Sequence, residues 1–235
     1  MFQIGKLYIV AVPIGNLEDI TLRALRILRE VDLILCEDTR VTKKLLNRYE
    51  IQKPLLSYHH HSKLSRVEKI MELLKNGKNL ALVSDAGTPG IQDPGNYLIF
   101  EILKNQKPKT ENQKFERNYI EITAVPGAST ITTIASIAGI NMDKFMFLGF
   151  PPHKKGRETF FRQVTESKYP VIYFESPHRF LKNLKLLEKL KPSAKLIIGR
   201  ELTKIFEEVV RGKIKEIREK WEKREIKGEF VVVVY

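Results

Sequence analysis

The residues from Leu80 to Val83 are all apolar, which is typical of a strand buried on both faces of a parallel sheet. Residues 84–95 then hold two Asp, three Gly and two Pro, so the chain leaves this strand in a tight, shaped loop. Because open α/β sheets bind ligands just past the carboxyl ends of their strands, we predict a ligand site here. The alternative is an ordinary turn, in which Asp93-Pro94 starts a helix.

The first half of the sequence alternates short apolar strands with helices. Asp19 or Thr21 can cap the first helix, and Gly77 is placed to end a later one. The predicted strands are residues 7–12, 31–36, 55–58, 79–83 and 119–125, and the predicted helices are residues 22–28, 41–49, 65–76 and 97–104. This order predicts a parallel sheet with right-handed crossovers.

The organisation changes near residue 128. Strands are predicted at residues 145–152, 171–174, 195–199 and 228–235, and helices at residues 131–138, 179–190 and 214–225. Residues 105–118 contain no aliphatic side chain and are predicted to form a solvated loop or flexible insertion. We therefore expect two α/β domains, residues 1–127 and 128–235.

Composition narrows the class of protein. The 235 residues carry 41 Lys and Arg against 28 Asp and Glu, a net charge of +13 that favours a polyanionic partner, nucleic acid first. The alternative is a Lys/Glu-rich surface of the thermophilic kind. With a single cysteine, Cys36, no signal peptide and no membrane-spanning run, we expect a cytoplasmic protein.

Three adjacent histidines, His59 to His61, suggest a metal site only weakly. Alternate side chains of an extended segment point to opposite faces, and no second cluster of ligands is visible in the sequence. We therefore predict no metal.

Three predicted strands end in loops rich in Gly and Pro, at residues 13–16 (PIGN), 84–89 (SDAGTP) and 125–129 (VPGAS). None fits the dinucleotide fingerprint G-x-G-x-x-G, and the P-loop motif is absent from the sequence. These loops favour a small ligand held by backbone edges and a few Ser, Thr and Asp side chains.

Motifs along almost the whole chain point to one family. They are VPIGNL (12–17), CEDTR (36–40), SDAGTPGIQDPG (84–95), VPGAS (125–129), FLGFP (147–151), YFESPHR (173–179), GRELTK (199–204), Glu207-Glu208 with Arg211-Gly212, and KGE (227–229). With these motifs in this order, the chain resembles the tetrapyrrole (corrin/porphyrin) methylase superfamily, and within it the branch that methylates RNA of the small ribosomal subunit.

The resemblance implies S-adenosylmethionine-dependent 2′-O-methylation of a cytidine ribose in the decoding region of 16S rRNA. It also implies a homodimer, and a parallel-sheet N-terminal domain and a mixed-sheet C-terminal domain with the cofactor cleft between them. By motif, the cofactor-binding residues would be Pro13, Ile14, Ser84, Asp85, Thr88, Ser129 and Thr130, with Phe174, Gly199 and Arg200 from the second domain.

The chain departs from this family at two places. Longer members carry a C-terminal helical extension, whereas this sequence stops after residues 230–235. Residues 105–118 also form a longer connection than is usual in the family.

Methyl transfer from a sulfonium is an in-line displacement, so alignment of the 2′-oxygen supplies much of the rate. A ribose hydroxyl is a poor acid, and a nearby base should help. The candidate bases are Asp38, Asp85, Glu175, Glu201, and Lys204 if its pKa is depressed. The alternatives are that Asp38 caps a helix, that Asp85 only binds cofactor, and that Glu175 or Glu201 pairs with Arg179 or Arg200.

Basic side chains near these motifs are predicted to contact RNA phosphates: Arg40, Lys154, Lys155, Arg157 and Arg179, with Lys204 as a further candidate. Two other functions stay open. One is a small-molecule methyltransferase of corrin or porphyrin chemistry, against which the net charge argues. The other is a non-catalytic RNA-binding assembly factor, which would leave the three shaped loops unexplained.

Overall fold

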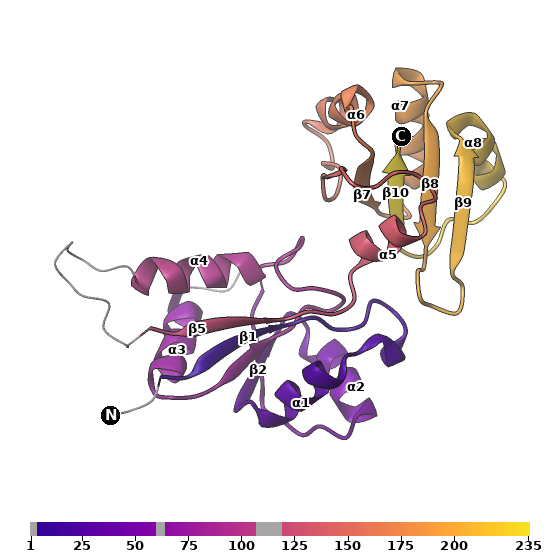
Figure 1. The fold of residues 1–235 in the computed structure, drawn as a ribbon. Helices are drawn as coiled ribbons and strands as arrows, with labels where there is room; N and C mark the ends of the chain where they lie inside the picture. Colours follow the sequence, from indigo (N-terminus) through magenta and orange to yellow (C-terminus); the bar gives the residue numbers. More distant parts are fainter. Residues whose placement is uncertain (1–3, 60–63, 107–118) are drawn as a thin grey trace. The chain divides into compact units, whose positions relative to one another are not determined.

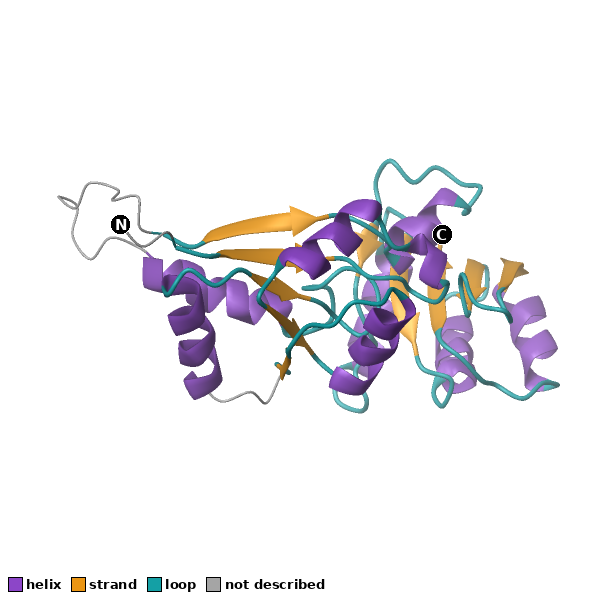
Figure 2. Ribbon diagram, turned by 90° about the horizontal axis from the view of Figure 1, so that it is seen from below, coloured by secondary structure: helices purple, strands orange, loops and turns teal. Residues whose placement is uncertain are grey.

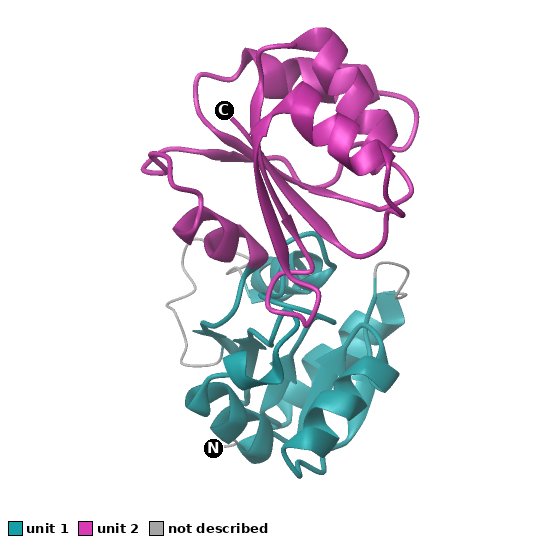
Figure 3. Cartoon of the chain, turned by 90° about the vertical axis from the view of Figure 1, so that its right-hand side faces the viewer, with its two compact units in different colours: residues 1–129 teal, residues 130–235 magenta. Residues whose placement is uncertain are grey.

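The computed structural model describes residues 4–59, 64–106 and 119–235. The chain divides into two compact units, residues 1–129 and 130–235, coloured separately in Figure 3. This division lies two residues beyond the expected boundary at residue 127. Each unit has its own sheet and its own hydrophobic core, and each is described by itself below.

Unit 1 is built on a five-stranded parallel sheet with the strand order β3-β2-β4-β1-β5. Figure 1 labels β1, β2 and β5 of this sheet, and Figure 2 draws the strands in orange. The strands of unit 1 are β1 (Lys6–Val10), β2 (Leu33–Cys36), β3 (Leu55–Ser57), β4 (Leu80–Leu82) and β5 (Glu121–Val125). Its helices are α1 (Leu22–Glu30), α2 (Thr39–Arg48), α3 (Leu64–Lys75) and α4 (Gly95–Gln106), with a 3₁₀ turn η1 (Leu17–Asp19). The predicted parallel sheet is confirmed.

The helices of unit 1 cover both faces of its sheet, and the central strands β2 and β4 are apolar for that reason. On one face α1 and α2 pack on Val10, Ile34 and Ala81. On the other face α3 and α4 pack on Leu7 and Leu80. Successive residues of a strand point to opposite faces, so a strand between two helical layers has no position for a polar side chain.

Unit 2 contains a mixed sheet with the strand order β6-β7-β10-β8-β9. Its strands are β6 (Met146–Phe147), β7 (Val171–Glu175), β8 (Lys195–Arg200), β9 (Glu208–Lys213) and β10 (Phe230–Val234). Its helices are α5 (Thr130–Ser136), α6 (Arg157–Glu166), α7 (Phe180–Leu190) and α8 (Ile214–Glu222). Strand β6 runs parallel to β7, whereas β10 is antiparallel to both of its neighbours. The predicted mixed second sheet is confirmed.

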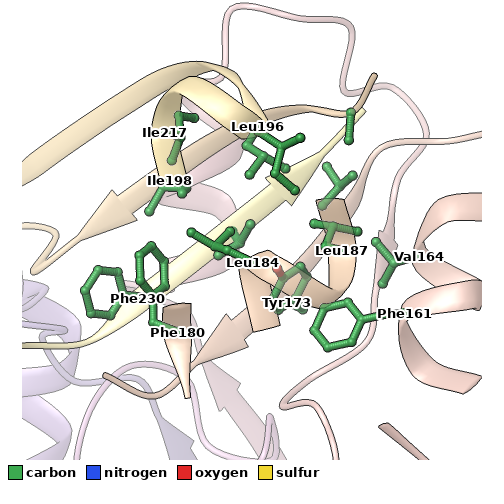
Figure 4. Close-up of a cluster of buried hydrophobic side chains, with 14 of the residues drawn as sticks. Phe161, Val164, Tyr173, Phe180, Leu184, Leu187, Leu196, Ile198, Ile217 and Phe230 are labelled. Atoms are coloured by element: carbon green, nitrogen blue, oxygen red, sulfur yellow. The ribbon is translucent and has the colours of Figure 1, made fainter. Parts of the chain in front are cut away.

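The core of unit 2 lies between its sheet and helices α6 to α8 (Figure 4). Phe180 of α7 stacks on Phe230 of β10 with ring centroids 4.3 Å apart, and Trp221 of α8 packs edge-on against both rings. Helix α5, with Ile134 fully buried, packs against β10.

Two elements of unit 2 were absent from the sequence prediction. Strand β9 is an edge strand whose central residue is charged and whose next residue is Gly212, so it lacks the apolar run that marked the other strands. Helix α6 lies between the strands predicted at residues 145–152 and 171–174, where no helix was predicted; its Phe161 and Val164 reach the core. The strand predicted at residues 145–152 is confined to the two residues of β6.

Candidate functional site

The three Gly/Pro-rich loops meet at the carboxyl ends of β4, β1 and β5. Val12 and Gly87 form an antiparallel bridge, with N–O distances of 2.9 and 3.1 Å. The hydroxyl of Thr88 donates to the carbonyl of Ala128 at 3.0 Å. The amide of Ala11 donates to the carbonyl of Val125 at 3.1 Å. The second loop is therefore hydrogen-bonded to the third loop and to the Val12-Pro13 start of the first, while the Ala11–Val125 bond joins the strand ends from which the first and third loops leave. The three loops form one connected group within unit 1.

Two residues fix the path of the central loop. Gly87 has a φ of +77°, and a Cβ there would stand 3.1 Å from the Ile14 side chain, so the close approach of the loops requires glycine. The buried hydroxyl of Ser84 donates to the carbonyls of Ala86 and Gly87, at 3.0 and 3.3 Å. Ser84 thus shapes the loop through the backbone.

Asp93 closes the same loop and precedes helix α4. Its carboxylate accepts hydrogen bonds from the amides of Gly90, at 2.7 Å, and Gly95, at 2.8 Å. The turn suggested by Asp93-Pro94 is therefore present, but it is one end of a longer loop that the other two loops hold in place.

A group of carboxylates links the ends of β2 and β4. Asp85 accepts the amide of Asp38 at 3.0 Å, and the amide of Asp85 lies 3.4 Å from the Glu37 carboxylate. Burial raises the pKa of Glu37, and the nearby charges of Asp85 and Asp93 raise it further. Glu37 belongs to one of the motifs of the sequence, but no role was predicted for it. Its position directly after a buried strand was the available signal.

Asp38 has a structural role at the start of α2. Its carboxylate accepts the amide of Arg40 at 2.8 Å as the N-cap and pairs with the Arg40 guanidinium at 2.6 Å. The hydrogen bonds from the Arg40 side chain and amide lower the pKa of Asp38 to about 2. The capping alternative describes Asp38 well, and so low a pKa makes it a weak base.

Glu175 lies at the end of β7 and is buried, only 2% exposed. Its carboxylate accepts hydrogen bonds from the amide of Ser176 and from the side-chain amide of Asn183, and it lies 3.8 Å from the Arg179 guanidinium. Burial raises its pKa, and these partners offset only part of that effect. The Glu175 carboxylate is thus held by partners that all belong to unit 2.

Arg157 and Arg179 hold the segment between β6 and α6. Arg157 donates to the carbonyl of Pro152 at 3.1 Å, and Arg179 donates to the carbonyl of Pro151 at 2.7 Å. The Arg179 side chain is only 14% exposed and also donates to Ser176. Contact of Arg179 with an RNA phosphate stays a prediction, whereas Lys154 and Lys155 are exposed on the segment that Arg179 holds.

Lys204 does not meet the condition for a base. Its ammonium donates to Glu201 at 3.0 Å and to Glu229 at 2.9 Å. Burial acts to lower its pKa, but the two carboxylates outweigh burial and the pKa is raised. For Glu201, burial is outweighed by the Glu229 amide and by Lys204, so its pKa is lowered. Glu201 pairs with Lys204, where Arg200 was the expected partner.

The register of the second sheet brings together three of the predicted cofactor positions of unit 2, Phe174, Gly199 and Arg200. Val231 of β10 lies opposite both Phe174 and Gly199, and Arg200 follows at the same end of β8. Phe174 contacts the Phe147 and Phe150 rings, with centroids 5.0 and 5.3 Å apart. Arg200 donates to the carbonyl of Lys227 at 2.7 Å.

In the described part of the chain, no three His, Cys, Asp or Glu side chains are grouped so that they could hold a metal ion. His59 is described, whereas His60 and His61 lie outside the described residues. None of the described helices combines the length and apolar character needed to cross a membrane.

A parallel α/β unit with bonded loops at the carboxyl ends of its strands, followed by a mixed-sheet unit, defines a two-domain α/β protein with a ligand site of the open-sheet type. The chain belongs to the family Tetrapyrrole (Corrin/Porphyrin) Methylases, whose model matches residues 6–218. The expected family is confirmed, and with it a methyltransferase.

Similar proteins extend this assignment. The chain is 44% identical to a Ribosomal RNA small subunit methyltransferase I of Thermotoga maritima, with 98% of each chain covered. It is 40% identical to the protein of the same name from Bacillus subtilis, over 99% of this chain and 75% of that one. Its fold resembles that of uroporphyrin-III C-methyltransferase from Thermus thermophilus, solved with S-adenosyl homocysteine, with a TM-score of 0.62, 17% identity and 97% of each chain covered.

Proposed function

We propose that this chain transfers a methyl group from S-adenosylmethionine to RNA of the small ribosomal subunit. We propose further that the acceptor is the 2′-hydroxyl of a cytidine ribose in the decoding region of 16S rRNA. The observation that carries the proposal is the 44% identity, over 98% of both chains, to a protein named Ribosomal RNA small subunit methyltransferase I. The cytidine and its position rest on the motif resemblance.

The residues of the three-loop site fit this cofactor chemically. S-Adenosylmethionine presents ribose hydroxyls, an ammonium group and an adenine edge, which are matched by a carboxylate and by backbone amides and carbonyls. The loops offer these groups through the exposed Asp85 and the peptide edges around Ile14 and Ala128. The loops are also preformed by their mutual hydrogen bonds, so little ordering entropy is lost on binding.

The cofactor supplies an electrophilic methyl group on a positively charged sulfur. The chain must align the 2′-oxygen in line with that methyl group, exclude water and accept the hydroxyl proton. The three hydrogen-bonded loops are proposed to position the cofactor. Exposed basic residues such as Lys154 and Lys155 are proposed to hold the flanking phosphates.

Among the carboxylates described above, Glu37 is the best candidate for the general base. It stands at the carboxyl end of β2 beside Asp85, where burial and the neighbouring carboxylates raise its pKa. Glu175 is buried and bonded, whereas Glu201, Asp38 and Lys204 are held in ion pairs that stabilise their charged forms. A carboxylate with a raised pKa is, once ionised, the more effective proton acceptor.

The decisive experiment is transfer of label from methyl-tritiated S-adenosylmethionine to purified small subunits, with free precorrin as the competing acceptor. The proposal expects label in 16S rRNA at a single cytidine, where the modified ribose resists alkaline cleavage. Label on the base would overturn the 2′-O assignment, and label on precorrin would favour the small-molecule methyltransferase. Calorimetry that detects no S-adenosylmethionine binding would favour a non-catalytic assembly factor.

The roles of Phe174, Gly199 and Arg200 and the homodimer stay predictions. Arg200→Ala is expected to raise the Kd for S-adenosylmethionine measured by calorimetry. A control at the exposed Arg162, which pairs only with Glu158 one helical turn away in α6, should leave that Kd unchanged. Light scattering tests the dimer.

A further inference from the structure

Unit 1 contains a hollow of about 820 Å³ between helix α2 and the segment that leads into strand β3. Three of its ten lining residues are cationic, namely Arg40, Lys43 and Lys53, and none is acidic. In a chain with 28 acidic residues against 41 basic ones, a lining of one sign selects for an anionic ligand.

The three cations are available to a ligand. Lys43 and Arg40 are exposed, and Lys53 is partly exposed. Arg40 pairs with Asp38, but 87% of its side chain remains exposed. No salt bridge within the described part of the chain neutralises Lys43 or Lys53.

The rest of the lining suits a nucleotide better than a simple anion. Leu46, Ile51 and Leu55 contribute apolar surface, and Asn47 and Gln52 contribute amide groups that can donate and accept hydrogen bonds. Apolar surface beside amides and cations accommodates a base, its polar edge and its phosphate in one groove. The hollow lies in the size range of small-molecule sites.

The position of the hollow connects it to the proposed reaction. Thr39 and Arg40, at the start of α2, line one end, and they follow Glu37 and Asp38 directly in the chain. The groove therefore begins beside the carboxylates at the carboxyl ends of β2 and β4. From there it follows α2 away from the three-loop site.

We propose that this groove binds the single-stranded RNA that flanks the methylated nucleotide, with phosphates on Arg40, Lys43 and Lys53 and a base over the apolar floor. The inference rests on the proposed function for the identity of the RNA. It adds a binding surface on α2 and residues 51–55 that the motifs did not indicate beyond Arg40.

The test compares the charge-reversed double variant Lys43→Glu/Lys53→Glu with wild type. A matched control for a charge reversal is Lys69→Glu, on an exposed position of α3, which covers the opposite face of the sheet. The probe is a single-stranded RNA oligonucleotide with the decoding-region sequence, and its Kd is measured by fluorescence anisotropy at several salt concentrations. Calorimetry with S-adenosylmethionine checks that the site of unit 1 remains intact.

We expect the double variant to weaken RNA binding at least tenfold at low salt, and to lower the slope of log Kd against log salt by about 1.5, since each single-strand phosphate contact contributes about 0.7. The Kd for S-adenosylmethionine should stay within twofold of wild type, and Lys69→Glu should change RNA binding less than twofold. Oligonucleotides carrying 4-thiouridine should crosslink to the peptide that holds residues 39–55.

Unchanged RNA affinity in the double variant, or crosslinks that lie outside residues 39–55, would overturn the proposal that the groove binds RNA. A change in oligomeric state without a change in RNA affinity would instead identify the hollow as a contact between copies and also overturn it. The proposed function is judged separately: it fails if the wild-type protein does not label small subunits, whatever the groove variants do.

Discussion

Glu37 and Asp38 are neighbours in the chain, yet their pKa values move in opposite directions. Asp38 caps α2 and pairs with Arg40, which stabilises its charged form. Glu37 points into the carboxylate group with Asp85 and Asp93, where burial and like charges disfavour ionisation. One residue is thereby suited to hold the backbone and the other to exchange a proton.

Glu37→Gln is expected to lower the single-turnover methylation rate about 100-fold, the lower end for loss of a general base, because alignment still supplies much of the rate. In wild type the rate should rise with pH through the raised pKa of Glu37 and then level off. Rapid-quench assays from pH 5 to 8 measure both effects. A wild-type rate in Glu37→Gln would remove Glu37 as the base.

The same pKa shift has a consequence for stability. A carboxyl whose pKa is raised in the folded state favours folding below its unfolded pKa, and this contribution is lost as pH rises through the folded value. Glu37→Gln removes that loss. The variant should therefore gain stability relative to wild type as the pH rises above the ordinary glutamate pKa, as followed by urea unfolding.

Gly228 offers a test of packing at a single atom. Its φ is +97°, and a Cβ would lie 2.6 Å from Cγ of Glu201, whose carboxylate holds the amide of Glu229 and the ammonium of Lys204. Gly228→Ala is expected to cost about 3 kcal/mol in the free energy of unfolding, because backbone strain and loss of these bonds add.

The control for this prediction is Gly139→Ala. Gly139 has a φ of +71°, and a Cβ added there would have no atom within 4 Å, so only the backbone cost of about 1 kcal/mol applies. Urea unfolding of both variants measures the difference. Equal losses would show that the clash with Glu201 is relieved without cost.

At the scale of elements, the bonds between loops are expected to matter more for ligand binding than for stability. Thr88→Val removes the hydrogen bond to Ala128 at nearly constant volume, which should cost about 1 kcal/mol of stability. Because this bond fixes two of the three loops, we expect the Kd for S-adenosylmethionine to rise about tenfold by calorimetry.

Thr123→Val is the matched control, since Thr123 lies in β5 and donates only to the exposed Glu121 side chain. It should leave the Kd for S-adenosylmethionine unchanged. If Thr88→Val and Thr123→Val have the same Kd for S-adenosylmethionine, the hydrogen bond between the second and third loops does not position the cofactor.

The elements that the sequence predicted well are those whose burial is simple. The central strands β2 and β4 of unit 1 lie between two helical layers, so their residues are apolar and the run is visible in the sequence. Strand β9 is an edge strand with no fully buried residue and a charged Arg211, and helix α6 has only two buried side chains. Which residues of these two elements are buried depends on contacts with segments that are distant in the sequence, and a short stretch of sequence does not reveal those contacts.

The same limit applies to the candidate site. The loops were predictable because turn residues after buried strands have few other interpretations. The roles of charged residues were not, because a Glu or Arg beside a motif fits a base, an ion pair or a backbone clamp equally well. Only the positions of Pro151 and Asn183 in space show that Arg179 holds a segment and that Glu175 is sealed inside unit 2.

At the scale of the whole molecule, the net charge of +13 leads us to expect that RNA binding depends strongly on salt, whereas binding of the cofactor does not. RNA binding through Lys154, Lys155 and the three cations of the α2 groove would make five phosphate contacts, which at about 0.7 each predict a slope of log Kd against log salt of about 3.5. Binding of S-adenosylmethionine, which depends on short hydrogen bonds inside preformed loops, should change little between about 50 and about 300 mM salt, a range over which screening of exposed charges becomes strong. Anisotropy with the RNA oligonucleotide and calorimetry with the cofactor, run over one salt series, measure the two dependences side by side. If the Kd for RNA does not change with salt, the excess of Lys and Arg does not contribute to substrate binding. If the Kd for S-adenosylmethionine changes steeply with salt, charge, and not the geometry of the loops, holds the cofactor.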